Sequence, residues 1–451
     1  MSNTIKLKKG LDIPLSGKAA LKIGLEVKPG IVALKPTDFR GLVPKLLVKE
    51  GDKVLAGTPL FADKMCQDIL FTSPVSGTVQ SIVRGEKRKL LAVLVKEDGL
   101  RKSVDFGKND PDKMSPDEIK SLLLKSGLWA SLIQRPYGIV ANPAAAPKAV
   151  FVSGFNTAPN AADVDFTLGS QAEFIQKGIS AVAKMAGCPL HLGLCSEKSP
   201  LATMKDATIH FFKGAHPAGN VGVQISAVSP IAKGDVVWTI SPMMLAAIGK
   251  LLSTGSLDMT RTVAITGPKA VNPCYVKTVA GMSMKSIADF IDADTPDCLL
   301  RIVSGDALSG TAVGGNGFLG FFDDQVTILG EDPSQEMFGW MNPIRSRHFS
   351  ASRAYFSRMC PNKKYDMETN LHGGVRAFMF NSIYSDVFPM DLFPVYLAKA
   401  CLAGDIDKME EYGIYEVLPE DFATCEFICP SKIEWQSIIE QGIQLMLKEM
   451  A

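Results

Sequence analysis

The sequence predicts an α+β and α/β multidomain protein, and three observations lead to that prediction. The first hundred or so of its 451 residues form short alternating apolar stretches with frequent glycine and proline. The middle of the chain alternates strand-like with helix-like segments, and the last part carries mainly helical patterns. Strands alone form sandwiches or barrels, and alternating segments form open sheets. We place the boundaries where the pattern changes and expect domains at 1–105, 106–258, 259–330 and 331–451.

Residues 1–105 are expected to form a barrel-sandwich domain. Two legs, 48–60 and 73–79, carry alternating apolar residues with Gly-Asp and Ser-Pro-x-x-Gly turns, a pattern of short twisted strands. It resembles the fold of biotinyl and lipoyl carriers, which bear their cofactor on a lysine eleven residues before the glycine that matches Gly77. That position is Cys66, and Lys64 lies outside the hairpin tip on this count. We therefore predict a scaffold, with a carrier as the alternative.

A capped helix is expected to open the second domain, 106–258. Ser115 can cap the helix, Pro116 suits its first turn, and Glu118 can reach back to the amide of the cap. The pattern then alternates between predicted strands and predicted helices. The strands are 149–152, 208–212 and 235–240, and the helices are 170–185 and 243–252. This alternation predicts an open α/β sheet of Rossmann-like character.

The last two domains differ in their patterns. Between 259 and 330, strand candidates at 264–267, 275–277 and 318–322 surround a short helix candidate at 283–291. Two strands, one short helix and a return strand predict a β-grasp (SLBB-like) domain. The segment 331–451 is predicted to be mainly helical, and its last helix is expected at 431–450 with Ser431 as the cap.

Composition excludes several classes of partner and places the chain in the cytosol. Its 48 basic residues nearly cancel 47 acidic ones, which leaves no electrostatic footprint for nucleic acid or anionic lipid. The longest apolar run, 236–252, is interrupted by Pro242 and Lys250, and the start lacks a signal-peptide core. We therefore expect no transmembrane segment. Nine irregularly spaced cysteines are typical of reduced cytosolic thiols.

Nucleotide and metal motifs are missing from the sequence. No G-x-G-x-x-G follows a predicted strand, no P-loop occurs, and the glycines at 314–317 are expected in a loop. No two of the five histidines have i,i+4 spacing, and His210 is expected to pack within a strand. His216 follows a strand in a Gly/Pro-rich loop, where open sheets place ligands. It is a candidate contact residue, with a turn-stabilising role as the alternative.

Two cysteines near the C-terminus match part of an iron–sulfur motif. Cys425-x-x-x-Cys429-Pro430 matches the last step of the bacterial ferredoxin run. The two preceding cysteine positions of that run hold Pro419 and Phe422. We therefore expect two thiols packed beside the last helix, with a cluster completed by the distant Cys360 and Cys401 as the alternative.

Several dispersed motifs are shared with one family. They are KKGLDIPL (8–15), FKGAHPAG (212–219), FGW (338–340), PMDLFP (389–394), CLAGD (401–405) and CEFICPSK (425–432). Together with the carrier-like barrel, they resemble the family of A subunits of the bacterial sodium-translocating NADH:quinone reductases (NQR) over essentially the whole chain. That family is distantly similar to the flavin-binding subunit of respiratory complex I and to the C subunit of the Rnf complex.

The resemblance accounts for the missing motifs. In the distant relatives, a Ser-Gly-Leu is followed by glycines that let FMN phosphate and NADH approach the backbone. Here Ser126-Gly127-Leu128 is followed by Trp129 and other bulky residues, which would occupy that space. The resemblance therefore implies a complex I flavin-subunit-like domain without a flavin or Fe-S cluster of its own. FMN, FAD, riboflavin and Fe-S would belong to partner subunits.

The implied function is support of quinone reduction coupled to sodium export. The chain would sit peripherally on the cytoplasmic face of the membrane, chiefly on the membrane-embedded B subunit, with quinone possible at an interface and no nucleic acid. Trp129, Arg135 and His216 are the candidate quinone or partner contacts, each with a structural role as the alternative. The alternative function is a flavin- and NADH-binding subunit of an Rnf-like or complex I-like redox complex.

Overall fold

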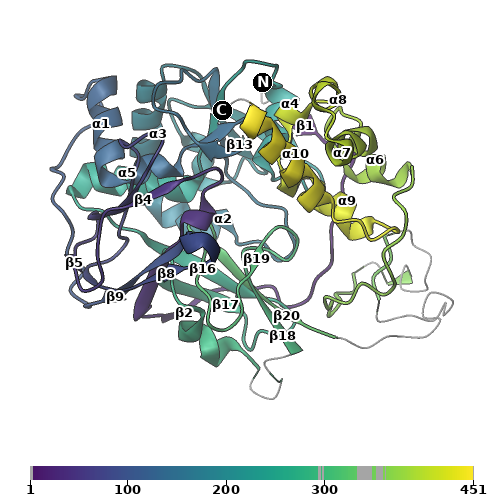
Figure 1. Ribbon diagram of the computed structural model, residues 1–451, viewed down its shortest axis with the longest axis horizontal. Helices are drawn as coiled ribbons and strands as arrows, with labels where there is room; N and C mark the ends of the chain where they lie inside the picture. Colours follow the sequence, from purple (N-terminus) through teal and green to yellow (C-terminus); the bar gives the residue numbers. More distant parts are fainter. Residues whose placement is uncertain are drawn as a thin grey trace.

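The computed structural model describes residues 4–292, 296, 299–332, 348–351, 359–360 and 362–449. In this part of the chain the strands form sheets of seven, six, four and three strands, surrounded by helices (Figure 1). The shared motif at 338–340 lies outside the described residues, as does part of the segment expected to be helical.

Two small sheets make the barrel. One has the order β3(Ile31–Leu34), β9(Leu90–Glu97), β8(Gly77–Arg84), β5(Lys53–Val54), and the other β4(Pro44–Leu46), β6(Pro59–Asp63), β7(Leu70–Thr72). Both sheets contribute buried side chains to one core, among them Val79 and Val93 from the first and Phe61 and Phe71 from the second. The rings of Phe61 and Phe71 stack with their centroids 4.9 Å apart. Alternating apolar residues thus form the barrel-sandwich as predicted.

A turn joins β6 to β7 at the hairpin tip. It spans 64–69, and its fold is closed by the Ile69 amide, which donates to the Cys66 carbonyl at 3.0 Å. Cys66 therefore lies in the tip, as predicted. Lys64 also lies in it as the exposed first residue of the turn, so its expected place outside the tip is wrong.

Two strands from the expected first domain belong to other sheets. β1(Thr4–Lys6) pairs in parallel with β14, and β2(Ala20–Glu26) pairs in parallel with β17. These two strands of the expected first domain thus pair outside the two small sheets, whose strands begin at Ile31. Strand patterns identify a strand but not its neighbour, because that neighbour is set by pairing between distant parts of the chain.

The central sheet follows the predicted alternation of strands and helices. Its order is β1, β14(Thr208–Lys213), β13(Leu190–Leu194), β12(Ala149–Ser153), β15(Val237–Thr239), β10(Ile133–Arg135), β11(Ile139–Val140). The first five strands run in parallel, and β10 and β11 add in antiparallel fashion. Alternate residues of β12 serve two cores, since Val150 and Val152 pack in one and Ala149 and Phe151 in the other.

Helices cover both faces of this sheet. They are α1(Pro116–Ser126), α2(Val164–Leu168), α3(Ala172–Ala186), α4(Val221–Val228) and α5(Pro242–Thr254). The predicted capping box of α1 is present, because Ser115 and Glu118 bond reciprocally to each other's amides. The helices α1, α3 and α5 lie together on one side of the molecule (Figure 1). The helix predicted at 170–185 is α3, which starts two residues later after a 3-10 turn.

Two glycines let α3 and α5 approach closely. A Cβ added at Gly178 would lie 2.2 Å from the Leu245 carbonyl oxygen. One added at Gly249 would lie 1.8 Å from the Phe174 carbonyl oxygen. Both distances are far below contact, so the helices meet backbone to backbone at these positions.

The third sheet has the order β19(Thr311–Ala312), β18(Leu300–Ser304), β20(Gln325–Gly330), β16(Thr260–Thr266), β17(Cys274–Val279), β2. The predicted strands 264–267 and 275–277 fall largely in β16 and β17, and the predicted short helix is the 3-10 helix Met284–Phe290. The strand expected at 318–322 does not form, and β20 takes its place. The loop is held instead by side chains: Arg261 Nη1 donates to the Phe321 carbonyl at 2.9 Å, and Asp38 accepts the Phe321 amide at 2.9 Å.

The C-terminal region is mainly helical from residue 383 on, whereas the described residues 362–382 form turns, bends and irregular backbone. Its helices are α6(Ile383–Val387), α7(Pro394–Ala403), α8(Ile406–Glu411), α9(Ala423–Ile428) and α10(Trp435–Glu449). The last helix starts later than predicted, because Lys432 has a φ of 56° and Glu426 accepts the Gln436 amide at 2.8 Å. Among the described residues, no helix has the length and apolar character needed to cross a lipid bilayer.

The close approach of α3 and α5 predicts an unusual response to alanine. Gly249→Ala should lower the free energy of unfolding by about 2 kcal/mol because the new methyl group overlaps the Phe174 carbonyl. Helix propensity alone would raise stability by about 1 kcal/mol. Urea unfolding measures the difference. Gly315→Ala, where nothing lies within 4 Å of the added Cβ, is the matched control and should change stability little. Equal effects of the two substitutions would contradict the packing argument.

Candidate functional site

Polar residues from four parts of the chain gather beside the central sheet, where His216 follows the carboxyl end of β14 and Arg135 pairs with the first residue of β15, at the amino end of that strand. We call this set the polar junction: Asp12, Arg135, His216, Glu420 and Asp421. Arg135 ends β10, and His216 lies in the loop between β14 and α4. Glu420 and Asp421 belong to the 3-10 helix Pro419–Phe422, which directly precedes α9. Open α/β sheets commonly bind their ligands beyond the carboxyl ends of the strands, which is the end at which the loop of His216 lies.

Arg135 is the buried centre of the polar junction. Its side chain is 2% exposed, and Nη2 lies 3.0 Å from Glu420 Oε1 while Nη1 lies 3.4 Å from Asp421 Oδ2. Asp421 is fully buried and also accepts the Leu418 amide at 3.0 Å. The Arg135 Nε atom is buried without a hydrogen-bond partner. A buried guanidinium with one fully buried carboxylate holds the two segments in a single arrangement, since either charge alone would be left unpaired in the interior.

The first turn of α4 packs against this ion pair. Asn220, which precedes α4, donates from Nδ2 to the Glu420 carbonyl at 3.2 Å. A Cβ added at Gly222 would lie 2.5 Å from Arg135 Nη1 and 2.6 Å from Asp421 Oδ2. The first turn of α4 is thus in contact with side chains of the protein itself. A phosphate bound there would have to displace them.

Hydrogen bonds from the backbone of His216 hold the N-terminal segment near the carboxyl end of β14. Its amide donates to Asp12 Oδ1 at 3.1 Å, and its carbonyl accepts the Leu11 amide at 2.8 Å. The imidazole is buried, with Nδ1 3.1 Å from Thr157 Oγ1. That hydroxyl accepts the Gly219 amide at 2.9 Å, so its own hydrogen is available for Nδ1. Burial lowers the pKa of His216, and three carboxylates oppose the shift: Asp306, Asp12 and Asp421.

Trp129 lies apart from the polar junction. It is fully buried, its Nε1 donates to the Ala141 carbonyl at 2.7 Å, and its ring meets Trp238 edge-on at 5.5 Å. The Gly127 that precedes it has a φ of 80°, and a Cβ there would lie 2.4 Å from Thr72 Oγ1. The Ser-Gly-Leu segment therefore packs against the barrel. Of the three candidate residues, Arg135 and His216 both lie near Asp421, whereas Trp129 packs in a separate hydrophobic core.

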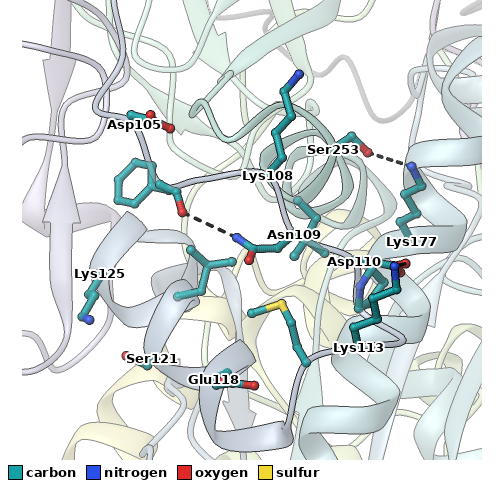
Figure 2. A pocket seen from close by; sticks show the side chains of 15 residues that line it. Asp105, Lys108, Asn109, Asp110, Lys113, Glu118, Ser121, Lys125, Lys177 and Ser253 are labelled. Carbon is teal, nitrogen blue, oxygen red and sulfur yellow. Dashed lines mark hydrogen bonds and ion pairs between the residues drawn. The ribbon is translucent and has the colours of Figure 1, made fainter.

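A hollow of about 1060 Å³ lies away from these residues, between the linker after the barrel and the helices α1, α3 and α5 (Figure 2). Its charged side chains come in nearly equal numbers: Lys108, Lys113, Lys125 and Lys177 against Asp105, Asp110 and Glu118. Two contacts within it are drawn in Figure 2, Lys177 Nζ to Ser253 Oγ at 3.0 Å and Asn109 Nδ2 to the Phe106 carbonyl at 3.5 Å. Near-balanced charge offers no cradle for a phosphate group.

Two histidines form a contact that the sequence did not indicate. His191 Nδ1 lies 3.0 Å from His210 Nε2 across the neighbouring strands β13 and β14. Both rings are half-buried, and burial is the main cause that lowers the pKa of each imidazole. His210 packs within its strand as predicted. Its partner is 19 residues away, and only the parallel register of the two strands makes them neighbours.

The late cysteines pack beside the last helix, as predicted. Cys425 and Cys429 are buried, and Cys429 Sγ lies 3.1 Å from the Tyr384 hydroxyl and accepts the Ile433 amide at 3.4 Å. Burial raises the pKa of the Cys425 thiol, which favours its neutral form. Across the described part of the chain, no group of three or more His, Cys, Asp or Glu side chains could hold a metal ion.

Two family models match the chain. One is the NqrA N-terminal barrel-sandwich hybrid domain, over residues 5–98, and the other is the NqrA second alpha/beta domain, over residues 114–257. These matches confirm the barrel-sandwich and a second α/β domain.

Relatives match over nearly the full length. Each of three is named as the A subunit of Na(+)-translocating NADH-quinone reductase. The protein of Yersinia pseudotuberculosis serotype O:1b is 33% identical over 96% of this chain and 97% of its own. That of Neisseria meningitidis serogroup C is 33% identical over 99% and 100%. That of Serratia proteamaculans is 35% identical over 99% and 100%.

Breaking the buried ion pair should destabilise the protein strongly. Asp421→Ala leaves the Arg135 guanidinium unpaired in the interior and should lower the free energy of unfolding by about 3–5 kcal/mol, measured by urea denaturation. Glu420→Gln should lower it less, because 36% of that side chain is exposed. The exposed Glu411→Gln is the control and should change it by less than about 0.5 kcal/mol. Similar losses for Asp421→Ala and Glu411→Gln would contradict the assignment.

The histidine pair predicts a loss of stability in mild acid. The folded-state pKa of His191 and His210 lies below the ordinary value of 6.5, so the unfolded chain takes up protons at a higher pH than the folded chain. Stability should therefore fall as the pH drops below about 6.5. The double variant His191→Gln/His210→Gln should show a shallower dependence in urea unfolding between pH 7 and pH 5. Identical slopes for the variant and the unaltered chain would rule out this contribution.

Proposed function

Because this chain belongs to the NqrA family, the A subunits of Na(+)-translocating NADH-quinone reductases, we propose that it is a peripheral subunit of such a complex. In this role it supports quinone reduction coupled to sodium export and carries no redox group of its own. Its enzymatic activity is then that of the assembled complex.

The filled edge of the central sheet is the observation that supports this role. A nucleotide phosphate needs free backbone amides and the space that glycine leaves at a helix start. Here the space beside Gly222 is taken by Arg135 and Asp421, and the loop of His216 is tied to the N-terminal segment. We therefore propose that flavin, NADH and Fe-S clusters are bound by partner subunits and not by this chain.

The same contacts disfavour the alternative of a flavin- and NADH-binding subunit. Isoalloxazine and phosphate would have to replace a buried ion pair and a buried tryptophan. A carrier function has one point in its favour, because Lys64 is exposed at the hairpin tip. Modification of that lysine would add a defined mass, which distinguishes a carrier from a scaffold.

For the contacts with quinone and with partner subunits, we propose surfaces of the chain and not individual residues. We place the chain on the cytoplasmic face of the membrane, against the membrane-embedded B subunit, with quinone at an interface between subunits. Trp129, Arg135 and His216 are buried and hydrogen-bonded within this chain. Their burial favours a structural role, in which they position the surrounding segments, over direct contact with quinone.

We also infer the finer domain assignments from the sheet orders. The parallel strands β14, β13, β12 and β15 with helices on both faces support a Rossmann-like origin for 106–258. The pairing of β16, β17, β18 and β20 around a short 3-10 helix supports a β-grasp (SLBB-like) domain at 259–330. The C-terminal helices then form the fourth domain.

Membranes that lack only this chain provide the test. They should lose NADH:quinone reductase activity and NADH-driven sodium uptake, and adding the purified chain should restore both. The purified chain itself should be colourless and have its unmodified mass. Stoichiometric flavin absorbance would contradict the proposal in favour of a redox subunit, and a mass increment on Lys64 would contradict it in favour of a carrier.

A further inference from the structure

The strand β2 forms an unusually long uncovered edge. Each sheet of the described chain has two edge strands, and all of them except β2 have two to four residues: β1, β3, β4, β5, β7, β11 and β19. β2 has seven residues and pairs on one side only, with β17. Proteins normally keep such edges short or cover them, because unpaired backbone groups bind other strands.

The side chains of β2 for which the structure describes the burial are exposed, and two of them are large and apolar. Leu21 is 59% exposed and Ile23 is 49% exposed, and residues two apart in a strand point to the same face. They therefore form an apolar row beside the open backbone edge. The register with β17 shifts twice, but both shifts lie on the paired side of the strand.

A hollow of about 410 Å³ adjoins this edge. It lies over one face of the sheet, next to β2, and is lined by Ile23, by the residues that follow β2, by residues of the neighbouring strands β17 and β16, and by α2. In strand addition, main-chain hydrogen bonds supply much of the affinity, and pockets beside the edge select the side chains of the added strand. The open edge and the hollow thus occur together where that mode of binding requires them.

The charges around the edge indicate what kind of strand fits. Basic side chains outnumber acidic ones there: Lys22, Lys28, Arg101 and Lys277 against Glu26 and Glu97. Arg101 and Glu26 already contact each other. The remaining basic excess favours a strand with carboxylates. It disfavours a second copy of this chain, since pairing two β2 strands would bring like charges together.

We propose that β2 receives an extended strand from a partner protein in the complex. The added strand presents apolar residues to Leu21 and Ile23, carries at least one carboxylate toward the basic side chains, and inserts one side chain into the hollow. This inference rests on the proposed function, because it names a surface through which the chain joins its complex.

The test measures binding of the purified chain to immobilised complex prepared without it. The double variant Leu21→Lys/Ile23→Lys removes the apolar row, and lysine is tolerated at both positions because they are exposed to solvent. The Kd of this variant for the complex should rise about tenfold or more. The matched control Met65→Lys/Leu100→Lys changes two other exposed positions, 81% and 61% exposed, and should bind like the unaltered chain. Circular dichroism and thermal unfolding verify that both variants fold.

Hydrogen exchange locates the contact directly. The amides of 20–26 that face away from β17 should exchange at least about tenfold more slowly in the complex than in the free chain. If the unaltered chain fails to bind, the proposed function itself is overturned. If it binds and the edge variant binds equally, or exchange at 20–26 is unchanged, only the present inference is overturned. A dimer of the isolated chain that the edge variant converts to monomer would show that a second copy is the occupant.

Discussion

The ion pair between Arg135 and Asp421 is the contact on which the arrangement of this protein depends. It joins the end of a strand in the central sheet to the C-terminal helical region across 286 residues of sequence. Because both charges are removed from water, each requires the other, and the segments that carry them must dock in one register. Two further contacts follow from that docking. The first turn of α4 packs against the ion pair at Gly222, and Asp12 accepts a hydrogen bond from the loop of His216.

This arrangement changes what the fold can do. The carboxyl edge of a parallel sheet is normally the place where an α/β protein leaves room for a ligand. Here the C-terminal region and the N-terminal segment cover that edge with their own side chains, and the interior becomes structural. In the function proposed above, the redox groups are bound by partner subunits, and this chain contributes surfaces to which those subunits bind. The open edge of β2 is the surface that most clearly lacks a covering element in the described part of the chain.

Much of the fold could be predicted because the signals are local. The strand at 149–152 is β12 in the structure, and the cap of Ser115 with Pro116 and Glu118 starts a helix, since the responsible residues are adjacent. Predictions failed where a distant contact decided the outcome. The apolar run 318–322 is a loop because Arg261 and Asp38 hold it, and the last helix begins at Trp435 because Lys432 has left-handed backbone geometry. Arg135 and His216 both lie near Asp421, a carboxylate that no local pattern in the sequence indicated.

The sequence by itself determined the kinds of elements, their caps, the scarcity of nucleotide and metal motifs, and the family that the chain resembles. These depend on residues a few positions apart, whose preferences act before the chain is folded. Only the tertiary structure decided that β1 and β2 leave the barrel for other sheets, that His191 faces His210, and that Asp421 neutralises Arg135. Such pairings depend on strand register and on the burial of charge between distant segments, and neither exists until the chain has folded.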